Sequence, residues 1–218
     1  MVVATLAVAL PVVVVAERLR VGAGRAVALS VVRGLSRACG IRYEVIGKDR
    51  LERSRAYVLV PNHASPADIP ALLVAAPDVR FVAAAELFRV PLLGAAMRSL
   101  GAIPVDRARP TRDGGRLTAP LDEGASVVVF AEGGIPEPGE HRRFTSGAFV
   151  LAIESGAPVV PVTITGTAAV LPRGQKIWVR PGLVTVEIHP PIETTGLTIR
   201  DRKRLRDDTE RAVRAETG

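Results

Sequence analysis

The chain has 218 residues, 48% hydrophobic and 23% charged, which excludes intrinsic disorder because enough apolar surface is available to offset the entropy lost on folding. Lysine and arginine exceed aspartate and glutamate by 29 to 22, favouring anionic partners, while 4% aromatics argue against stacking single-stranded nucleic acid. The single cysteine, Cys39, excludes an internal disulfide and a paired-cysteine metal or redox site.

Two apolar segments of different character open the sequence. Residues 1–16 carry no charged side chain but, as a helix, would span only about 24 Å, short of the ~30 Å hydrocarbon core of a bilayer. Residues 21–39 place arginines among alanine, valine and leucine, which is typical of a basic amphipathic helix. We expect a membrane-associating helical pair over residues 1–41, although a buried helix followed by a surface helix would give the same pattern.

Residues 42–218 form a second domain in which strand-like and helix-like segments alternate. Seven strands are expected, at 43–47, 57–60, 80–84, 102–105, 126–131, 159–164 and 184–188. Helices are expected at 66–76, 86–100, 111–123, 147–155 and 200–216. Valine-rich strands without strict alternation indicate a sheet covered on both faces, and the alternation with helices indicates parallel connections. The predicted fold class is therefore α/β, with a single mixed, largely parallel sheet of about seven strands covered by helices.

Among the three histidines, His63 has the setting that best suits chemistry. It follows a buried-looking strand and precedes a helix, so it should emerge at the carboxyl end of the strand, where open α/β sheets bind ligands. Asp68 comes one turn of chain later and could orient the imidazole as a general base. The alternative is structural, because Ser65, Pro66 and Asp68 also match a helix capping box. His141 in a polar loop and His189 at a strand end suit solvated or structural roles.

Two more strand ends carry polar groups. The strand at 102–105 leads to Arg107, followed by Arg109, Arg112 and Arg116. Guanidinium groups at a strand end suit bidentate phosphate binding, although a solvated charged loop accounts equally well for the last three. The strand at 126–131 leads to Glu132 and then Gly133 and Gly134, where backbone amides could approach a ligand closely. A plain turn with an exposed glutamate is the alternative.

Other chemistries lack their sequence signatures. No Walker A loop and no dinucleotide-binding glycine motif follows a strand, and no histidine–carboxylate cluster has metal-ligand spacing. We therefore expect neither a metal nor a cofactor, and no nucleic-acid partner, since the net charge of +7 stands without a recognition motif.

Four blocks, in order, resemble those of the 1-acyl-sn-glycerol-3-phosphate acyltransferases, within the wider glycerolipid and lysophospholipid acyltransferases. Residues 62–68 (NHASPAD) are similar to the histidine–aspartate block, and residues 101–107 (GAIPVDR) resemble the second block. Residues 130–133 (FAEG) resemble the third, and residues 160–164 (VPVTI) match the fourth. The resemblance runs from about residue 42 to 192.

The resemblance implies transfer of an acyl group from acyl-CoA or acyl-carrier protein to lysophosphatidic acid, giving phosphatidic acid. His63 would then be the general base, oriented by Asp68. The substrate-binding residues would be Arg107 on the acceptor phosphate, Glu132 and Gly133 at the acceptor site, and Pro161 on the donor side. The partners would be membrane phospholipids, and the enzyme would sit at the cytoplasmic face of the cell membrane, peripheral or monotopic through its N-terminal segment.

One departure from the family pattern bears on the acceptor. The third block of the family continues with threonine and arginine, whereas Gly134 and Ile135 stand here. Arg142 or Arg143, a short loop away, could replace the missing arginine; otherwise the acceptor is another lyso-lipid. Two further hypotheses remain open: hydrolysis of a thioester or lipid ester by the same dyad, and non-catalytic binding to anionic lipid.

Overall fold

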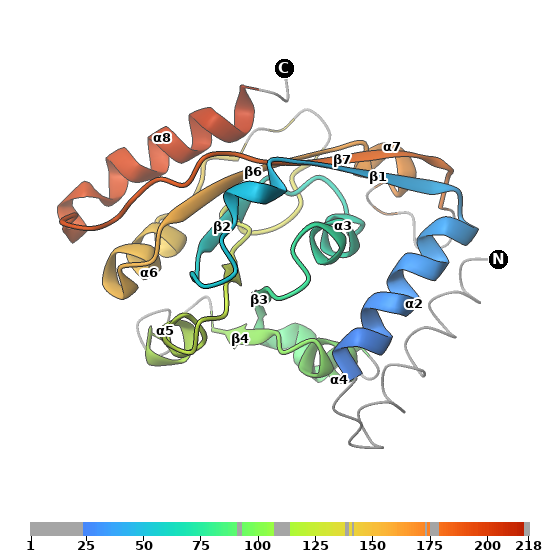
Figure 1. Cartoon of the computed structure of the whole chain (residues 1–218), viewed down its shortest axis with the longest axis horizontal. Helices are drawn as coiled ribbons and strands as arrows, with labels where there is room; N and C mark the ends of the chain where they lie inside the picture. Colours follow the sequence, from blue (N-terminus) through green and yellow to red (C-terminus); the bar gives the residue numbers. More distant parts are fainter. Residues whose placement is uncertain are drawn as a thin grey trace.

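The structure is a computed structural model, and it describes residues 24–90, 93–106, 114–137, 140, 142–172, 174 and 179–215. Its centre is a seven-stranded sheet in the order β1-β7-β6-β2-β5-β3-β4 (Figure 1). The strands are β1 (Ile41–Ile46), β2 (Val58–Pro61), β3 (Arg80–Ala84), β4 (Ile103–Val105), β5 (Val127–Val128), β6 (Val159–Thr165) and β7 (Gly182–Ile188). Each lies at one of the seven predicted places.

The sheet is mixed, as predicted. The five strands from β6 to β4 run parallel to one another, and β7 pairs antiparallel with β6 and parallel with β1. In register, Val58 of β2 pairs with Val127 of β5 and with Val159 of β6. The carboxyl ends of β6, β2 and β5 therefore meet at one edge, the place predicted for ligands.

Helices cover both faces of the sheet because successive strand residues point in opposite directions. Leu59 of β2 belongs to a buried cluster with side chains of α3 (Asp68–Ala75) and α7 (Thr167–Val170). Its neighbours Val58 and Val60 belong to a second cluster with α5 (Gly114–Asp122), α6 (Gly147–Ser155) and α8 (Arg202–Arg214). Figure 1 shows α6 and α8 on the left and α2 and α3 on the right.

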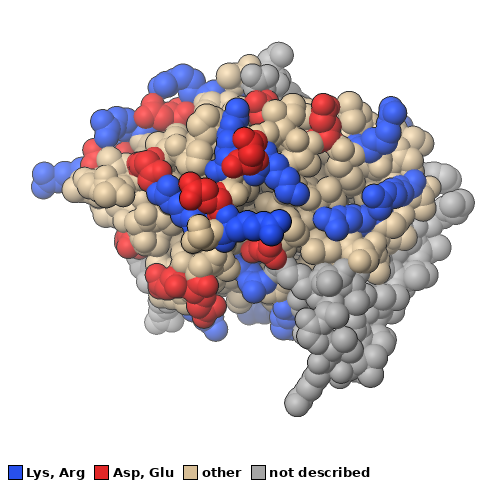
Figure 2. All heavy atoms as spheres, in the orientation of Figure 1, with Lys and Arg blue, Asp and Glu red and all other residues tan. Residues whose placement is uncertain are grey.

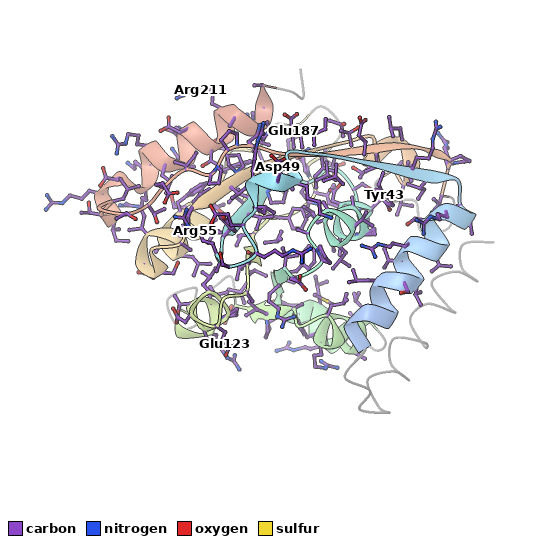
Figure 3. All side chains as sticks on the ribbon, in the orientation of Figure 1. Tyr43, Asp49, Arg55, Glu123, Glu187 and Arg211 are labelled. Carbon is purple, nitrogen blue, oxygen red and sulfur yellow. The ribbon has the colours of Figure 1, made fainter. Side chains whose placement is uncertain are left out.

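The described part of the N-terminal segment is one helix, α2 (Gly24–Ala38), and residues 1–16 lie outside the described residues. Leu29 and Val32 of α2 pack against the core, and Ser36 hydrogen bonds through Oγ to Tyr43 Oη of β1 at 3.0 Å. Tyr43 is labelled in Figure 3. None of the described helices combines the length and the apolar character that crossing a bilayer requires.

Two predicted elements differ in detail. The helix expected at 86–100 is divided into a 3-10 helix, η2 (Ala85–Arg89), and α4 (Leu93–Ser99). The cause is Pro91, because a proline restricts the residue before it to extended angles, and Val90 has ψ 120°. The strand expected at 126–131 pairs only over Val127–Val128. The described residues of 129–146, between β5 and α6, are called the site loop below. Helix α7 and the 3-10 helix η1 (Lys48–Arg50) were not predicted, and the helix predicted at 200–216 begins as a 3-10 helix, η4 (Ile199–Asp201), before it continues as α8.

Candidate active site

The candidate site lies where β2 and β5 end. His63 follows Pro61, the last residue of β2, by two positions, and Glu132 follows the end of β5 by four. Because β2 and β5 are neighbouring parallel strands, the two side chains reach the same edge of the sheet. The histidine–aspartate pair and the Glu132 loop, each predicted at a strand end, are thus brought together by adjacent strands.

His63 and Asp68 form a hydrogen-bonded pair. His63 Nδ1 lies 2.8 Å from Asp68 Oδ2, and the same oxygen accepts the backbone N–H groups of Ala64 at 2.8 Å and Ser65 at 2.9 Å. An acceptor with two backbone donors favours the tautomer in which Nδ1 carries the hydrogen, which leaves a lone pair on Nε2. The Asp68 side chain is fully buried and that of His63 is 13% exposed, so the imidazole is partly open to solvent while the carboxylate stays dry.

The capping-box interpretation and the dyad interpretation share the same carboxylate. The bond from the Ser65 N–H to Asp68 is one half of a capping box. The Ser65 hydroxyl instead accepts from the Ala67 N–H at 3.0 Å and donates to the Leu171 carbonyl at 2.6 Å, which ties this turn to the end of α7. Asp68 therefore supports the turn and the imidazole together.

Two further residues hold the histidine in place, and sequence reasoning assigned neither of them a role. The ring of Phe130, on the loop after β5, stacks on the imidazole with centroids 3.9 Å apart. Asn62 donates through Nδ2 to the Ile164 carbonyl at 2.9 Å and accepts the Ile164 N–H at 2.7 Å. The loop after β2 is thereby fixed to β6. The sequence pointed to these two residues only through their positions, because Asn62 lies in the first family-like block and Phe130 in the third.

Glu132 is half-buried, and its carboxyl accepts a hydrogen bond from the His63 backbone. Burial raises the pKa of its carboxyl to about 7, against the opposing effects of a hydrogen bond from the His63 backbone and the positive charge of Arg214. The negative charges of Asp68 and Glu210 raise the pKa further. Within the described part of the chain, Glu132 Oε2 is buried with no hydrogen-bond partner. At neutral pH this carboxyl is divided between its two protonation states.

The departure from the family pattern has a backbone counterpart. Gly133 has φ 75° and Gly134 has φ 150°, both in the region that side-chain-bearing residues rarely adopt. A threonine at position 134 would be strained in this turn. The glycine that stands in place of the family's threonine is therefore the residue that this turn conformation requires.

The two arginines suggested as replacements lie in different places. Arg142 Nη1 stands 3.8 Å from where a Cβ on Gly134 would be, and its Nε donates to Glu140 Oε1 at 2.9 Å. Arg143 turns away and its Nη2 donates to Asp207 Oδ1 of α8 at 3.2 Å. Arg142 is therefore the candidate beside the glycine turn, and Arg143 belongs to the contact with α8.

The remaining predicted residues are placed as follows. Arg107 and His141 lie outside the described residues. Pro161 is buried within β6, where it pairs in register with Val60, so its predicted donor-side role stays a prediction. Thr163 Oγ1 donates to the Val213 carbonyl at 3.0 Å and therefore accepts from His189 Nε2 at 2.8 Å, which makes His189 a structural link between β7, β6 and α8.

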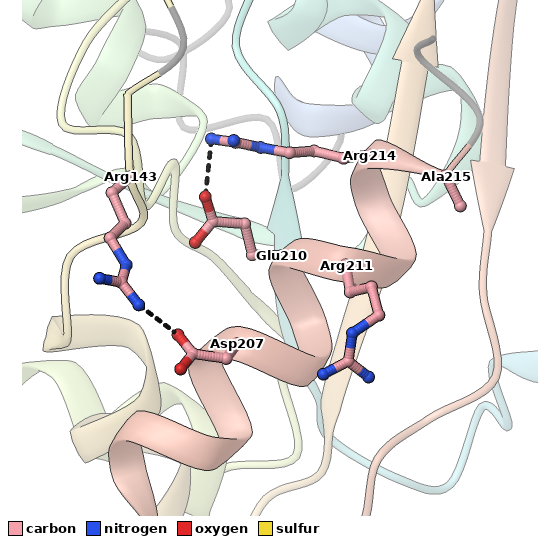
Figure 4. A pocket seen from close by; sticks show the side chains of 6 residues that line it. All are labelled: Arg143, Asp207, Glu210, Arg211, Arg214 and Ala215. Atoms are coloured by element: carbon pink, nitrogen blue, oxygen red, sulfur yellow. Dashed lines mark hydrogen bonds and ion pairs between the residues drawn. The ribbon is translucent and has the colours of Figure 1, made fainter.

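A groove of about 670 Å³ opens beside this site, along the last two turns of α8 (Figure 4). It is lined by Arg143, Asp207, Glu210, Arg211, Arg214 and Ala215. Each of its guanidinium groups is paired with a carboxylate: Arg143 with Asp207, Arg211 with Asp208 and Arg214 with Glu210. Basic and acidic side chains are also interspersed on the face drawn in Figure 2. Over the described ranges, no three potential metal ligands lie together.

Comparisons with known proteins point one way. The family described as Acyltransferase matches residues 42–165. The chain is 30% identical to 1-acyl-sn-glycerol-3-phosphate acyltransferase beta of Homo sapiens over 84% of this chain and 67% of that protein. It is 36% identical to the chloroplastic enzyme BAT2 of Brassica napus, of whose length it spans only about 40%. The structure resembles the crystal structure of the 1-acyl-sn-glycerophosphate acyltransferase PlsC from Thermotoga maritima, with a TM-score of 0.74, 25% identity, and coverage of 94% of this chain and 87% of that one.

Proposed function

This chain belongs to the acyltransferase family, and from that membership we propose that it transfers a fatty acyl group to the sn-2 hydroxyl of lysophosphatidic acid, giving phosphatidic acid. The observation that carries the proposal is the His63–Asp68 hydrogen bond at the carboxyl end of β2. The printed names of the relatives support lysophosphatidic acid as the acceptor. The donor is acyl-CoA or an acyl-carrier protein.

The chemistry begins with the acceptor hydroxyl, which is a poor nucleophile until a base removes its proton. His63 Nε2 takes that proton as the oxygen attacks the thioester carbonyl, and the Asp68 carboxylate stabilises the imidazolium that forms. Collapse of the tetrahedral intermediate breaks the carbon–sulfur bond, and the imidazolium returns the proton to the departing thiolate. Because a thioester is already activated, the proposed reaction calls for no metal ion and no covalent enzyme intermediate.

The acceptor phosphate needs cationic partners. The resemblance assigns Arg107 to it, and the position of Arg142 beside Gly134 supports a second guanidinium there. Glu132 and Gly133 shape the acceptor site between His63 and this arginine. The departure at Gly134 and Ile135 favours one alternative, a different lyso-lipid acceptor, and this alternative is an outcome of the test below.

We further propose that the enzyme works at the cytoplasmic face of the cell membrane, peripheral or monotopic through the N-terminal segment. The apolar run over residues 1–16, followed by Arg18 and Arg20, supports this placement, because basic residues next to an apolar segment favour the cytoplasmic side. Acceptor and product are both lipids, so an enzyme held at the bilayer meets its substrate there.

The test is acyl transfer from labelled acyl-CoA to lysophosphatidic acid in detergent micelles, with wild type and His63→Ala in parallel. We expect phosphatidic acid from the wild type only, with both proteins giving the same circular dichroism spectrum. Product from His63→Ala would contradict the assigned base. Free fatty acid from the wild type would favour hydrolysis. If no product forms, a panel of other lyso-lipids and acyl-carrier-protein donors decides whether the acceptor or the donor is wrong.

A further inference from the structure

One face of α8 contacts three consecutive residues of the site loop. Asp207, Glu210 and Arg214 share that face, because they are spaced three and four residues apart on a helix. Arg214 Nη2 donates to the Arg142 carbonyl at 2.7 Å, Asp207 accepts from Arg143 at 3.2 Å, and Glu210 Oε2 accepts the Phe144 N–H at 3.4 Å. Figure 4 shows these side chains along the groove.

The same loop is fastened on its other side to the end of β5. Thr145 donates through its backbone N–H and its hydroxyl to the Ala131 carbonyl, at 2.8 Å and 2.9 Å. Phe144, between the two anchors, is 2% exposed and lies in the core cluster of α6 and α8. The backbone that carries Arg142 is therefore fixed relative to both Glu132 and α8.

Of the α8 side chains that contact the site loop, Glu210 and Arg214 are the two whose charges also act on Glu132. These two side chains are 2.7 Å apart, and both of their charges act on the Glu132 carboxyl, with Arg214 lowering its pKa and Glu210 raising it. Arg143 is 69% exposed on its side chain and faces Asp207 instead.

We propose that Glu210 and Arg214 are positioning residues, which hold Arg142 beside the Gly133–Gly134 turn so that its guanidinium meets the phosphate of the acceptor. Both lie beyond residues 42–165, the part that matches the family. A helix outside the family blocks thus positions Arg142, the residue that replaces the arginine missing from the third block. This inference rests on the proposed function, since it assumes a phosphate-bearing acceptor.

The test is a double-mutant cycle on acceptor binding, with Arg142→Gln, Arg214→Gln and the double variant. Arg142→Gln and Arg214→Gln should each raise the KM for lysophosphatidic acid by about tenfold, the lower range for a hydrogen bond to a charged group. The kcat and the KM for acyl-CoA should stay within about twofold. If Arg214 acts through Arg142, the double variant should be no worse than Arg142→Gln alone.

Arg211→Gln is the matched control, because Arg211 lines the same groove on α8 but pairs with Asp208 of its own helix, whereas Arg214 bonds to the Arg142 carbonyl. Its KM should equal that of the wild type. Glu210→Gln is the second variant should Arg214→Gln fold poorly, and it should raise the same KM. With monoacylglycerol, which has no phosphate, all variants should match the wild type.

The outcomes separate the two proposals. A wild type that acylates no phosphate-bearing lyso-lipid refutes the proposed function. A wild type that is active, with an acceptor KM that Arg214→Gln and Glu210→Gln leave unchanged, refutes the positioning role alone. Additive effects in the double variant, or equal losses with lysophosphatidic acid and monoacylglycerol, also refute it, because they indicate an action that does not pass through Arg142.

Discussion

At the scale of single residues, the site depends on one carboxylate with two tasks. Asp68 Oδ2 accepts from the His63 ring and from two backbone N–H groups of the turn that precedes α3. The structural task and the chemical task therefore cannot be told apart by burial or by hydrogen bonding. They can be told apart by a substitution that keeps the acceptor oxygen and removes the charge.

Asp68→Asn is that substitution. The amide oxygen can still accept the N–H groups of Ala64 and Ser65, but an imidazolium at His63 loses its counter-charge. We expect kcat per folded molecule to fall by roughly 10²- to 10⁴-fold, the usual contribution of general base catalysis. Asp201→Asn is the control, because Asp201 closes a capping box with Thr198 at the start of η4, in which neither residue of the dyad takes part. It should lower stability slightly and leave turnover unchanged. Turnover that survives in Asp68→Asn would assign Asp68 a structural role only.

Glu132 provides a pH-dependent prediction. Its pKa is about 7 in the folded protein and near the ordinary 4.5 when unfolded, so between these values the folded state binds more protons and stability falls as pH rises. Glu132→Gln removes this penalty. The variant should gain about 1–2 kcal/mol over the wild type at pH 8, after allowance for solvent screening of a half-buried group, and little at pH 5. Urea unfolding at both pH values measures the difference. A gain equal at both pH values would contradict it.

At the scale of elements, the ends of β2 and β6 are joined by a side chain. Asn62 makes two hydrogen bonds to the backbone of Ile164, whose side chain is 1% exposed. These bonds hold the loop that carries His63 against β6, the strand next to β2 in the sheet. The geometry of the dyad therefore depends on a contact between strands that are about a hundred residues apart in the chain.

Asn62→Ala should destabilise the protein by about 2–3 kcal/mol, because it leaves a buried N–H and a buried carbonyl without partners. Ser155→Ala is the matched control, since its hydroxyl makes only local bonds, donating to the carbonyls of Leu151 and Ala152 and accepting the N–H of Ala157 at 3.4 Å. It should change stability by less than about 1 kcal/mol. The free energy of unfolding in urea measures both. Equal, small effects would show that the Asn62 contact does not hold the loop.

At the scale of the whole molecule, a net charge of +7 accompanies an apolar N-terminal segment. Acidic side chains are interspersed with the basic ones on the face drawn in Figure 2, so the excess charge forms no single patch there. Attraction to an anionic bilayer is then expected to be general and weak, with the apolar segment supplying the rest of the affinity.

Vesicle co-sedimentation of the full chain tests this division. Binding to vesicles with a quarter phosphatidylserine should exceed binding to pure phosphatidylcholine, and 0.5 M salt should remove the difference because charges are screened. The binding that persists in salt measures the apolar contribution. Each basic residue near the surface contributes about 1 kcal/mol, so Arg37→Gln on the exposed side of α2 should weaken only the salt-sensitive part. Binding insensitive to both lipid charge and salt would contradict the electrostatic part.

The sequence by itself determined the fold class and the places of the strands. Strand-sized apolar runs broken by turns located all seven strands, because local hydrophobic patterning depends only on near neighbours. The same reasoning brought His63 and Asp68 together, since five residues at a helix start are a local distance. It also placed Glu132 at the end of a strand, and the parallel pairing of β2 with β5 in the structure puts that end at the same edge as His63.

Only the tertiary structure decided which distant residues complete the site. No local pattern shows that Asn62 reaches Ile164, that Phe130 stacks on His63, or that α8 contacts the loop of Arg142. Arg142 and Arg143 were equivalent in sequence, and the packing of α8 separated them. The physical reason is that strand order and helix docking depend on burial of the whole core, in which contacts between distant segments form cooperatively.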